Sequence, residues 1–460
     1  MHIPFIWSGV RYESKHRRDL KSLQGLSLGE IDELPSILIS RIAHELKATP
    51  KQALADIHKA FKKAADLFGS ATLDGESPQD YVRHVHLISG VPLKAIKSSV
   101  KELCHALATA EQYITGSAPN LAPIYTENAP RKNKTAYWVP KGQILSVIAP
   151  GNNPAVHKAW IEALAAGYKI LLRPSAKDPF TPYRLIRCLL AAGISPFMIA
   201  LVPGDHSIVQ AIVDAGDLAL VFGDRNTVEQ YKGNPKVITR GPGYSKVYWH
   251  FEASNHDLTA HAQARDVIVR SIVDGGGMKC TNASGVVVNK AHLYELDEIA
   301  QQLNGHGSNG LLDYTSDLPV FTSDKAYAIR DYVHQIFHST DILWKNVKDE
   351  EWIIDYGDGT AALSPLLVHI NHLPDHIRYM ELPFACSWVY TPEPDEVRQT
   401  LKSTLALSLL TEDQDLIHWA ITEPTIKKLV INNAPTWTTH DMVPHDGFIT
   451  EHLFISKGVI

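Results

Sequence analysis

Short apolar runs alternate with amphipathic segments in the middle of the chain. Ile144–Ile148 has the pattern of a buried strand, and residues 155–166 have helical spacing that ends before Gly167. The same unit is then repeated. Further strands are expected at 170–172, 198–202 and 218–222, and further helices at 181–192 and from Ser207. This alternation predicts βαβ units and an α/β fold with a parallel sheet covered on both faces.

The sequence before residue 140 has a different pattern. Residues 1–18 predict an irregular leader, and residues 20–112 are mainly helical in spacing, with helices expected at 37–46, 50–68 and 98–114. A connector rich in Pro, Asn and Ala at 117–131 leads to a strand expected at 135–139. After the βαβ units, the segments 247–251 and 266–274 open a second αβ region.

Cys280 follows the glycines Gly275–Gly277 and precedes a Val-rich strand. Glycines let the backbone adopt φ > 0 and let a ligand approach the main chain. A thiol in such a turn is typical of a nucleophile that faces a pocket, and backbone dipoles there could lower its pKa. An inert buried cysteine fits the same pattern, because free cysteine is among the most buried residues. The segment alone leaves both interpretations open.

Composition excludes several classes of protein. The 460 residues carry a net charge of −6 without a charge block, so no nucleic-acid partner is expected. The first residues lack the pattern of a signal peptide, and no apolar run is long enough to span a membrane. Four cysteines in so long a chain do not indicate a disulfide framework, so we expect a reducing, cytoplasmic location. The length predicts two packed domains.

A series of short motifs follows in a fixed order along the chain. The motifs are Pro150-Gly-Asn152-Asn-Pro154, Arg173-Pro-Ser175, Val202-Pro-Gly204, Val221-Phe-Gly223-Asp224, Gly277-Met-Lys-Cys280 and Glu381-Leu-Pro-Phe384. With these motifs in this order the chain resembles the aldehyde dehydrogenase superfamily. The resemblance implies a Rossmann-type parallel-sheet cofactor domain, an α/β catalytic domain and a helical N-terminal region. It also implies that Cys280 is the nucleophile.

The resemblance implies roles for individual residues as well. Asn152 would donate its side-chain amide to the developing oxyanion, with the backbone N–H of Cys280 as second donor. An Asx turn before the helix is the alternative role for Asn152. Glu381 would hold the nicotinamide ribose. The expected cofactor-binding residues are Ala149, Pro150, Gly151, Arg173, Ser175, Ala176, Lys177, Gly204, Gly223, Asp224, Glu381 and Phe384.

One departure from the family pattern bears on the reaction. Hydrolytic members carry a glutamate in a Glu-Leu-Gly-Gly-Lys segment, and this glutamate activates water against the acyl-enzyme. The corresponding stretch here, Val237–Lys246, contains no carboxylate. Without a positioned base, worth about 10²–10⁴-fold, an acyl-cysteine is hydrolysed slowly and can instead exchange with a thiol or accept a hydride. The chain therefore resembles the bacterial long-chain fatty acyl-CoA reductases of the bioluminescence type, and Pro444-His-Asp-Gly447 fits that branch.

The resemblance also leads to a prediction of the cofactor. NAD-preferring relatives carry a glutamate at the position of Ala176, where it accepts hydrogen bonds from the adenosine ribose. Ala176, between Arg173 and Lys177, would not repel a 2′-phosphate, so NADPH is expected. The helix expected from Ser207 would offer its N-terminus to the pyrophosphate.

The expected activity is NADPH-dependent reduction of an acyl thioester to the aldehyde through acyl-Cys280, with acyl-CoA or acyl-carrier protein as donor. One alternative is a hydrolytic, oxidising NAD(P)-dependent aldehyde dehydrogenase whose base is Glu252 or Glu381. Another is an acyltransferase or acyl-binding scaffold that passes no hydride. A homo-oligomer and an acyl-transferring or acyl-activating partner enzyme are also expected.

Four regions are expected along the chain. Residues 1–115 should form a mainly helical N-terminal region packed on the cofactor domain. The NAD(P)-binding domain should comprise residues 116–247 and the catalytic domain residues 248–425. The C-terminal segment, 426–460, should return to the active site or to an oligomer interface.

Three other patterns resemble functional motifs, but each has a simpler structural interpretation. Gly305–Gly310 satisfies the dinucleotide fingerprint but follows a helical segment rather than a strand, so it predicts a loop. The histidines at 84, 86, 369, 372 and 376 have no Cys or carboxylate at ligand spacing, so no metal is expected. Trp352 and Trp437 could line an acyl tunnel, but a place in the core is the more frequent role of such residues.

Overall fold

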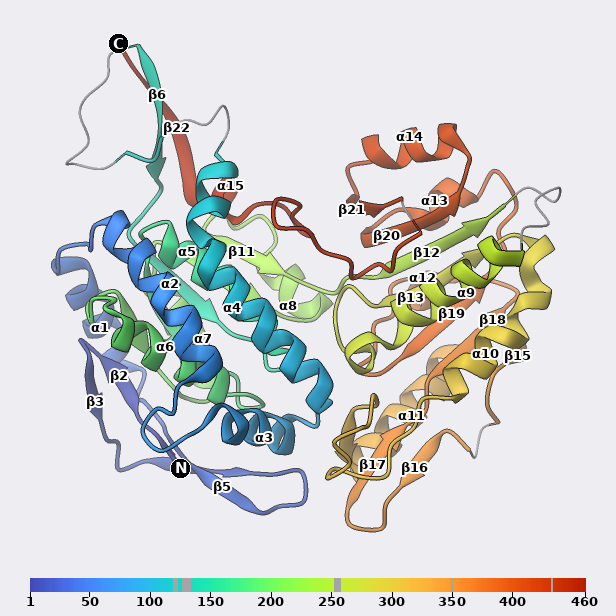
Figure 1. Ribbon diagram of the computed structural model, residues 1–460, viewed down its shortest axis with the longest axis horizontal. Helices are drawn as coiled ribbons and strands as arrows, with labels where there is room; N and C mark the ends of the chain where they lie inside the picture. Colours follow the sequence, from blue (N-terminus) through green and yellow to red (C-terminus); the bar gives the residue numbers. More distant parts are fainter. Residues whose placement is uncertain (119–122, 126–133, 252–257, 349–350, 432) are drawn as a thin grey trace. The chain divides into compact units, whose positions relative to one another are not determined.

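The computed structural model describes residues 1–118, 123–125, 134–251, 258–348, 351–431 and 433–460. These residues form two compact units (Figure 1). Unit 1 comprises residues 1–89, 96–241 and 447–460, and unit 2 comprises residues 90–95 and 242–446. After residues 90–95 the chain enters unit 2 again at Pro242, whereas the sequence predicted a domain boundary at 247/248. The N-terminal region shares unit 1 with the expected cofactor-binding segment.

A seven-stranded sheet forms the centre of unit 1, in the order β11-β10-β7-β8-β9-β2-β3. Its five parallel strands are β7 (Ile144–Ile148), β8 (Lys169–Arg173), β9 (Ile199–Leu201), β10 (Leu218–Phe222) and β11 (Val237–Arg240). The apolar runs predicted all of these strands except β11. Because helices cover both faces of a parallel sheet, such strands are apolar throughout and are recognisable without alternation.

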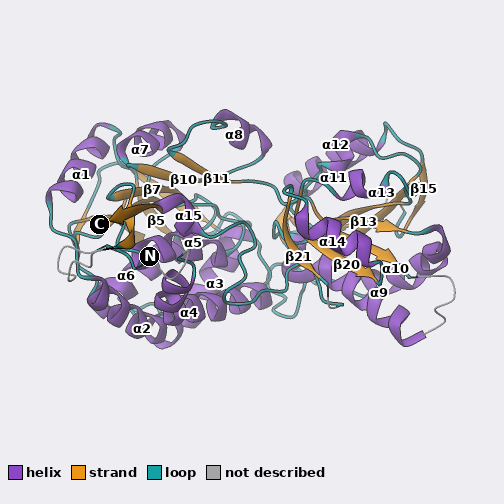
Figure 2. Ribbon diagram, turned by 90° about the horizontal axis from the view of Figure 1, so that it is seen from above, coloured by secondary structure: helices purple, strands orange, loops and turns teal. Residues whose placement is uncertain are grey.

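Helices cover both faces of this sheet (Figure 2). On one face α1 (Ile37–Ala48) and α7 (Val209–Ala215) share a core cluster with strand residues such as Ile144 and Leu171. On the other face lie α5 (Lys158–Ala165), preceded by a 3₁₀ turn at Pro154–His157, and α6 (Phe180–Ala192). The remaining helices that contribute to this unit are α2 (Leu54–Ser70), α3 (Pro78–Ser89), α4 (Leu93–Gly116), α8 (Arg225–Gln230) and α15 (Ile449–Leu453).

The N-terminus differs from the prediction of an irregular leader. It forms the strands β1 (His2–Ile3), β2 (Phe5–Trp7), β3 (Val10–Tyr12), β4 (Arg17–Lys21) and β5 (Ser27–Asp32). Strands β2 and β3 extend the large sheet beyond β9, and the other three form a sheet of their own in the order β1-β5-β4. Strands this short carry little periodicity, so they are ordered by pairing with segments distant in sequence, such as Ile6 with Leu201.

The C-terminal segment is divided between the units. Residues 426–446 belong to unit 2, whereas residues 447–460 return to unit 1. There β22 (Phe454–Val459) pairs antiparallel with β6 (Thr135–Pro140) along its whole length. The expected connector at 117–131 lies largely outside the described residues.

Unit 2 contains a second seven-stranded sheet, in the order β15-β18-β19-β13-β12-β20-β21. Its parallel strands are β12 (Ser245–His250), β13 (Ala283–Val288), β18 (Leu366–Ile370), β19 (Cys386–Tyr390), β20 (Thr404–Thr411) and β21 (Ile426–Val430). The edge strand β15 (Ile342–Lys345) runs antiparallel to β18. A small antiparallel sheet joins β14 (Val320–Thr322), β17 (Thr360–Leu363) and β16 (Ile353–Asp355).

Each face of the unit 2 sheet has its own core. On one face pack α9 (Leu258–Val273) and α10 (Leu296–Asn304), and on the other α11 (Ser323–Phe337) and α12 (Asp375–Arg378) (Figure 2). The other helices are α13 (Val397–Leu401) and α14 (Gln414–Thr422). Trp352 is buried in the core on the α11 face, as expected for core packing. Residues 305–310 are neither helix nor strand, which confirms the predicted loop.

Candidate functional site

The expected cofactor-binding residues of unit 1 gather at one edge of its sheet. Strand β7 leads to Ala149–Asn152, β8 to Arg173–Lys177, β9 to Gly204 and β10 to Gly223–Asp224. Because parallel strands end at the same edge, the structure brings these loops together. Strands β8 and β9 follow β7 on one side of it in the sheet. The chain then crosses to the other side of β7, where it forms β10 and β11. In open α/β sheets, ligands bind at the point where the strand order reverses in this way.

Two of these loops approach each other at Gly151. A Cβ at this position would lie 2.5 Å from Oγ of Ser175 and 2.8 Å from Cβ of Lys177. Only glycine therefore fits between the loop after β7 and the loop after β8 without displacement. Ala176 and Lys177 are exposed at the same place. The exposed tip of the second loop thus lies beside the backbone of the first.

Arg173 has a structural role that the sequence did not reveal. Its guanidinium is buried, and Nε donates hydrogen bonds to the carbonyl oxygens of Gly204 (3.1 Å) and Asp205 (3.2 Å). Asp205 in turn caps the helical turn where the pyrophosphate was expected, because its carboxylate accepts from the N–H of Ser207 at 2.8 Å. The carboxylate of Asp205 thus already occupies the N–H of Ser207 in this turn.

The loop after β7 contains two adjacent asparagines with different roles. Asn153 caps the following turn, since its Oδ1 accepts from the N–H of Ala155 (2.8 Å) and from Oγ of Ser99 (2.9 Å). The Asx-turn role that was the alternative for Asn152 therefore belongs to Asn153. Asn152 lies in unit 1 and Cys280 in unit 2, so the oxyanion pocket made by both stays a prediction.

In unit 2, Cys280 lies on a turn that is held by its neighbours. Asn282 fixes the turn because its Oδ1 accepts from the N–H of Lys279 (2.8 Å) and its Nδ2 donates to the carbonyls of Ser271 (3.1 Å) and Asp274 (3.0 Å). Nζ of Lys279 forms an ion pair with Asp274 at 2.8 Å. The thiol is half-buried at the end of this turn.

Two further segments pack directly on the turn. Gly277 has φ of +73°, and a Cβ there would lie 2.3 Å from the backbone nitrogen of Ala385. Ser245, at the start of β12, donates from Oγ to the carbonyl oxygen of Cys280 at 2.8 Å. The end of the Glu381–Phe384 motif therefore meets the cysteine turn through its backbone, and the Val237–Lys246 stretch meets it through the hydroxyl of Ser245.

Glu381 and Phe384 have different environments. The carboxylate of Glu381 accepts from the N–H of Gly243 at 2.5 Å. Desolvation by the surrounding protein raises the pKa of Glu381, although the residue is exposed to solvent, and hydrogen bonds from the N–H groups of Gly243 and Tyr244 oppose the rise. The ring of Phe384 is buried and stacks on Trp352 at 5.8 Å. A contact of Phe384 with the cofactor stays a prediction.

The electrostatics of Cys280 oppose the expectation of a lowered pKa. Desolvation raises the pKa of the thiol to about 12, and the charges of Glu381 and Asp446 add to the rise. The ammonium of Lys428 and a backbone hydrogen bond act in the opposite direction. Desolvation and the two carboxylates outweigh the lowering effects of Lys428 and the backbone hydrogen bond, so the pKa of the thiol lies above its ordinary value of 9.0.

Two residues that position the turn, Ser245 and Asn282, were not identified from the sequence. Lys246 was not singled out either. It is buried and donates from Nζ to the carbonyl oxygen of Tyr244 (2.9 Å) and to Oγ1 of Thr404 (2.7 Å), which joins the starts of β12 and β20. Lysine inside an apolar strand is the one sequence signal for Lys246, because such a residue needs buried acceptors.

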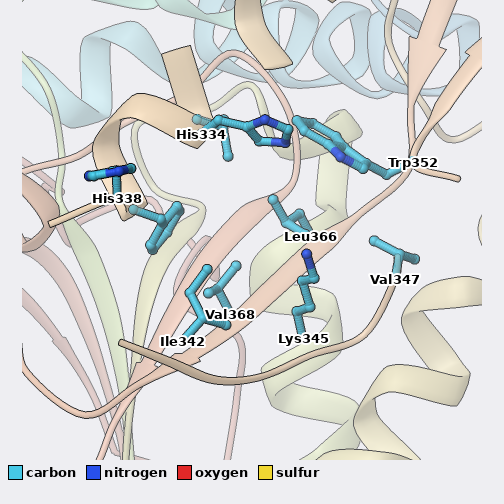
Figure 3. A pocket seen from close by; sticks show the side chains of 10 residues that line it. His334, His338, Ile342, Lys345, Val347, Trp352, Leu366 and Val368 are labelled. Atoms are coloured by element: carbon cyan, nitrogen blue, oxygen red, sulfur yellow. The ribbon is translucent and has the colours of Figure 1, made fainter. Parts of the chain in front are cut away.

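Unit 2 also contains a pocket. Figure 3 shows it between α11, β15 and β18, where His334, His338 and Lys345 accompany apolar side chains such as Trp352 and Val368. None of the predicted site residues lines it. Within the described part of the chain, no group of His, Cys, Asp and Glu has the arrangement of a metal site, and no helix is long and apolar enough to cross a membrane.

The comparisons with known proteins identify the family. The sequence model of the aldehyde dehydrogenase family matches residues 62–336, more than half of the chain. The protein belongs to the aldehyde dehydrogenase family. It is 25% identical over 284 residues to the malonate-semialdehyde dehydrogenase of Lacticaseibacillus casei, and 24% identical over 323 residues to the 1-pyrroline-5-carboxylate dehydrogenase of Staphylococcus aureus. These matches cover 58% and 65% of this chain and 54% and 60% of the relatives.

Solved structures confirm the predicted fold class over the whole chain. HpcC from Thermus thermophilus superimposes with a TM-score of 0.80 at 16% identity, covering 99% of this chain and 92% of the other. An indole-3-acetaldehyde dehydrogenase in complex with NAD⁺ gives a TM-score of 0.79 at 17% identity, covering 99% and 95%. At these identities the match establishes the aldehyde dehydrogenase-like α/β fold, and the resemblance to acyl-CoA reductases stays a prediction.

Proposed function

We propose that the protein reduces an acyl thioester to the aldehyde with NADPH, through a covalent acyl-Cys280 intermediate. One observation carries this proposal. The segment Val237–Lys246, which packs on the cysteine turn, contains no carboxylate. Without a base at this place, water is a poor acceptor for the acyl group. A hydride or a second thiol then becomes the more effective acceptor.

Cys280 and Asn152 have different roles in this reaction. The Cys280 thiolate attacks the thioester carbon, its sulfur gains the acyl group, and the donor thiol departs with a proton. NADPH, when bound, would supply the hydride that converts the acyl-enzyme to the oxyanion of a hemithioacetal. When this hemithioacetal collapses, the carbon–sulfur bond breaks, the aldehyde leaves and the Cys280 thiolate is restored. The amide of Asn152 would donate to the developing oxyanion, an interaction worth roughly 10²–10³ in rate.

The sheet edge of unit 1 supports binding of a nicotinamide dinucleotide, with the loops after β7, β8, β9 and β10 as its walls. The preference for NADPH rests on the exposed pair Ala176 and Lys177, which presents a cation and no acid to the adenosine ribose. Arg173 is engaged with Gly204 and Asp205, so Lys177 becomes the principal phosphate contact in this proposal. The acyl donor is acyl-CoA or an acyl-carrier protein, and the assembly is a homo-oligomer that cooperates with an acyl-transferring or acyl-activating enzyme.

Oxidation of an aldehyde with NAD(P)⁺ is the second candidate. The two named relatives are a malonate-semialdehyde dehydrogenase and a 1-pyrroline-5-carboxylate dehydrogenase, which favours this candidate. Glu381 would be its base, since its charge acts on Cys280 and its raised pKa suits proton abstraction. Glu252, the other carboxylate considered as a base, lies outside the described residues. An acyltransferase that passes no hydride would form the acyl-enzyme but consume no cofactor.

One assay separates these functions. The protein is incubated with acyl-CoA and NADPH while cofactor absorbance and aldehyde are followed, and in parallel with aldehyde and NAD(P)⁺. The proposal requires aldehyde formation that Cys280→Ala abolishes and that the matched change Cys104→Ala leaves intact. Rapid production of free acid from aldehyde, without reduction of acyl-CoA, would establish the second candidate. Acylation of Cys280 without cofactor turnover would establish an acyltransferase.

A further inference from the structure

We propose that Lys428 is the cationic partner of the Cys280 thiolate, and that its ammonium stabilises the thiolate before the acyl group is taken up. This inference rests on the proposed role of Cys280 as nucleophile. It does not depend on the acyl donor, on the cofactor or on the direction of the reaction. Neither the motifs of the family nor the sequence pattern assigned a role to this lysine.

The register of β21 determines which face of the sheet Lys428 occupies. Ala406 of β20 pairs with Lys428, and successive residues of a strand point to opposite faces. Leu407 and Leu409 belong to the core on the α11 face, whereas Leu410 belongs to the core on the α9 face. Ala406, which alternates with Leu407, therefore lies on the α9 face, and so does Lys428.

Cys280 lies at the same end of the same face. Helix α9 ends at Val273 and the glycine turn carries the chain from there to the thiol. Oγ of Ser245 donates to the carbonyl oxygen of Cys280 and accepts from the N–H of Ala406 at 3.2 Å. Cys280, Ser245, Ala406 and Lys428 thus form a continuous row across three strands. Neighbouring strands are about 4.8 Å apart, and alanine in the middle of the row leaves space for the lysine stem.

Lys428 is buried at this place, with 5% of its side chain exposed. A short segment covers it. The carbonyl oxygen of Thr438 accepts from Nζ at 3.1 Å, and the same segment is tied to α9 because the N–H of Thr436 donates to Oγ of Ser271 (3.1 Å). Burying an ammonium is costly unless an anion or several acceptors compensate it. The thiolate is the anion that the row of residues provides.

The charges around the pair support this assignment. Burial and the charge of Lys279 lower the pKa of Lys428 to about 8, and the thiolate of Cys280 opposes this decrease. Lys428 in turn lowers the pKa of Cys280 against desolvation and the charges of Glu381 and Asp446. Lys279 already has Asp274 as its partner at 2.8 Å. Lys428 is therefore the cation available to the thiolate.

A purely structural role is the competing interpretation. In that case Lys428 would anchor the segment of Thr438, and its charge would not affect the thiol. The two interpretations differ in the reactivity of Cys280, which can be measured without acyl donor or cofactor. The rate of alkylation by iodoacetamide follows the thiolate fraction, because the thiolate and not the thiol is the nucleophile.

The experiment follows alkylation of Cys280 against pH by peptide mass spectrometry in the full-length protein. Lys428→Met should slow alkylation at pH 8 by about tenfold or more, because a neighbouring cation is worth one to three pKa units. Lys428→Arg keeps the charge and should stay within about threefold of the natural protein. Lys427 is exposed, so Lys427→Met is the matched control and should leave the rate of Cys280 alkylation unchanged. Equal profiles for Lys428→Met and the natural protein, or equal losses in both Lys428 variants, would overturn the inference.

A second measurement needs no folded variant. In the natural protein the ratio of alkylation by iodoacetate to that by iodoacetamide should fall as the pH rises through the pKa of Lys428, about 8, because the cation that attracts the anionic reagent is lost. A ratio that does not change with pH would contradict the proposal. If the protein fails to reduce acyl thioesters but these profiles hold, the proposed function falls and the role of Lys428 stands. If the protein reduces acyl thioesters but Lys428→Met leaves the alkylation profile of Cys280 unaltered, the proposed function stands and the role of Lys428 falls.

Discussion

Gly243 and Cys280 lie backbone against backbone in unit 2. A Cβ at Gly243 would be 1.7 Å from the carbonyl oxygen of Cys280, a distance that no side chain can adopt. The same glycine donates its N–H to Glu381 and accepts at its carbonyl from the N–H of Leu405 at 2.8 Å. One residue without a side chain thus connects the nucleophile turn, the Glu381 motif and the start of β20.

We expect Gly243→Ala to displace the cysteine turn. The thiol would lose its position relative to Lys428 and Glu381, so acylation of Cys280 should fall by at least about 10²-fold, the effect of about 1 Å of misplacement. Acyl transfer to the protein, followed by mass spectrometry, checks this. Gly307→Ala is the control, because a Cβ there meets nothing within 4 Å. Full acylation of the Gly243→Ala protein would show that the turn tolerates the shift.

The acyl-enzyme should persist in the absence of NADPH. Because no carboxylate in Val237–Lys246 activates water, the adduct on Cys280 should last for minutes and then be discharged by added thiol or by NADPH. Intact-protein mass spectrometry after addition of acyl-CoA measures its lifetime directly. Loss of the adduct within seconds in buffer alone would favour the hydrolytic alternative.

Neutralising Glu381 should have two separable effects. Glu381→Gln removes a negative charge that raises the pKa of Cys280, so alkylation of the thiol should become faster, by about tenfold for each pKa unit. The Michaelis constant for the cofactor should rise as well if Glu381 holds the ribose. Steady-state kinetics and alkylation rates measure the two effects independently. Loss of aldehyde oxidation alone, with unchanged cofactor binding, would instead identify Glu381 as a general base.

The cofactor preference can be tested at the exposed loop after β8. Ala176→Glu should weaken NADPH much more than NADH, by about tenfold or more, because the new carboxylate would face the 2′-phosphate. Dissociation constants for both cofactors check this without dependence on the substrate. Ala191→Glu, at another exposed alanine of unit 1, should affect neither. Equal losses for the two cofactors would mean that this loop does not contact the ribose.

Glu162 should make the stability of the protein depend on pH. The carboxyl is buried in α5 with Nζ of Lys158 at 3.6 Å, and desolvation raises its pKa to about 7. Between the ordinary value of 4.5 and about 7 the folded protein keeps a proton that the unfolded chain releases, so the free energy of unfolding falls as the pH rises through this range. Above it, Glu162→Gln should be more stable by about 1–3 kcal/mol. Denaturant titrations at pH 5 and pH 8 measure the difference.

Glu102 is exposed, and Glu102→Gln is the control for this prediction. Neutralising a solvated carboxylate should leave the free energy of unfolding nearly unchanged. The free energy of unfolding of the Glu162→Gln protein could instead depend on pH as that of the natural protein does. This result would show that Glu162 ionises without cost, through its contact with Lys158.

The residues that line the nucleophile turn were accessible to sequence reasoning only in part. Gly277 and Cys280 stood out because glycines beside a cysteine form a local pattern. The sequence offered an Asx turn as the alternative role of Asn152, and only the structure showed that Asn153 caps the turn, where its Oδ1 also accepts from Ser99 of a distant helix. Lys427 and Lys428 are equivalent in the sequence, and the pairing of β21 with β20 decides which one is buried.

The sequence by itself determined the α/β class, the strands β7, β8, β9 and β10 with their helices, and the cysteine that serves as candidate nucleophile. These features follow from local periodicity and from residues adjacent in the chain. The tertiary structure decided the strands of residues 2–32, the engagement of Arg173 with Gly204, and the raised pKa of Cys280. Strand pairing and desolvation depend on groups far apart in sequence, so no local pattern could specify them.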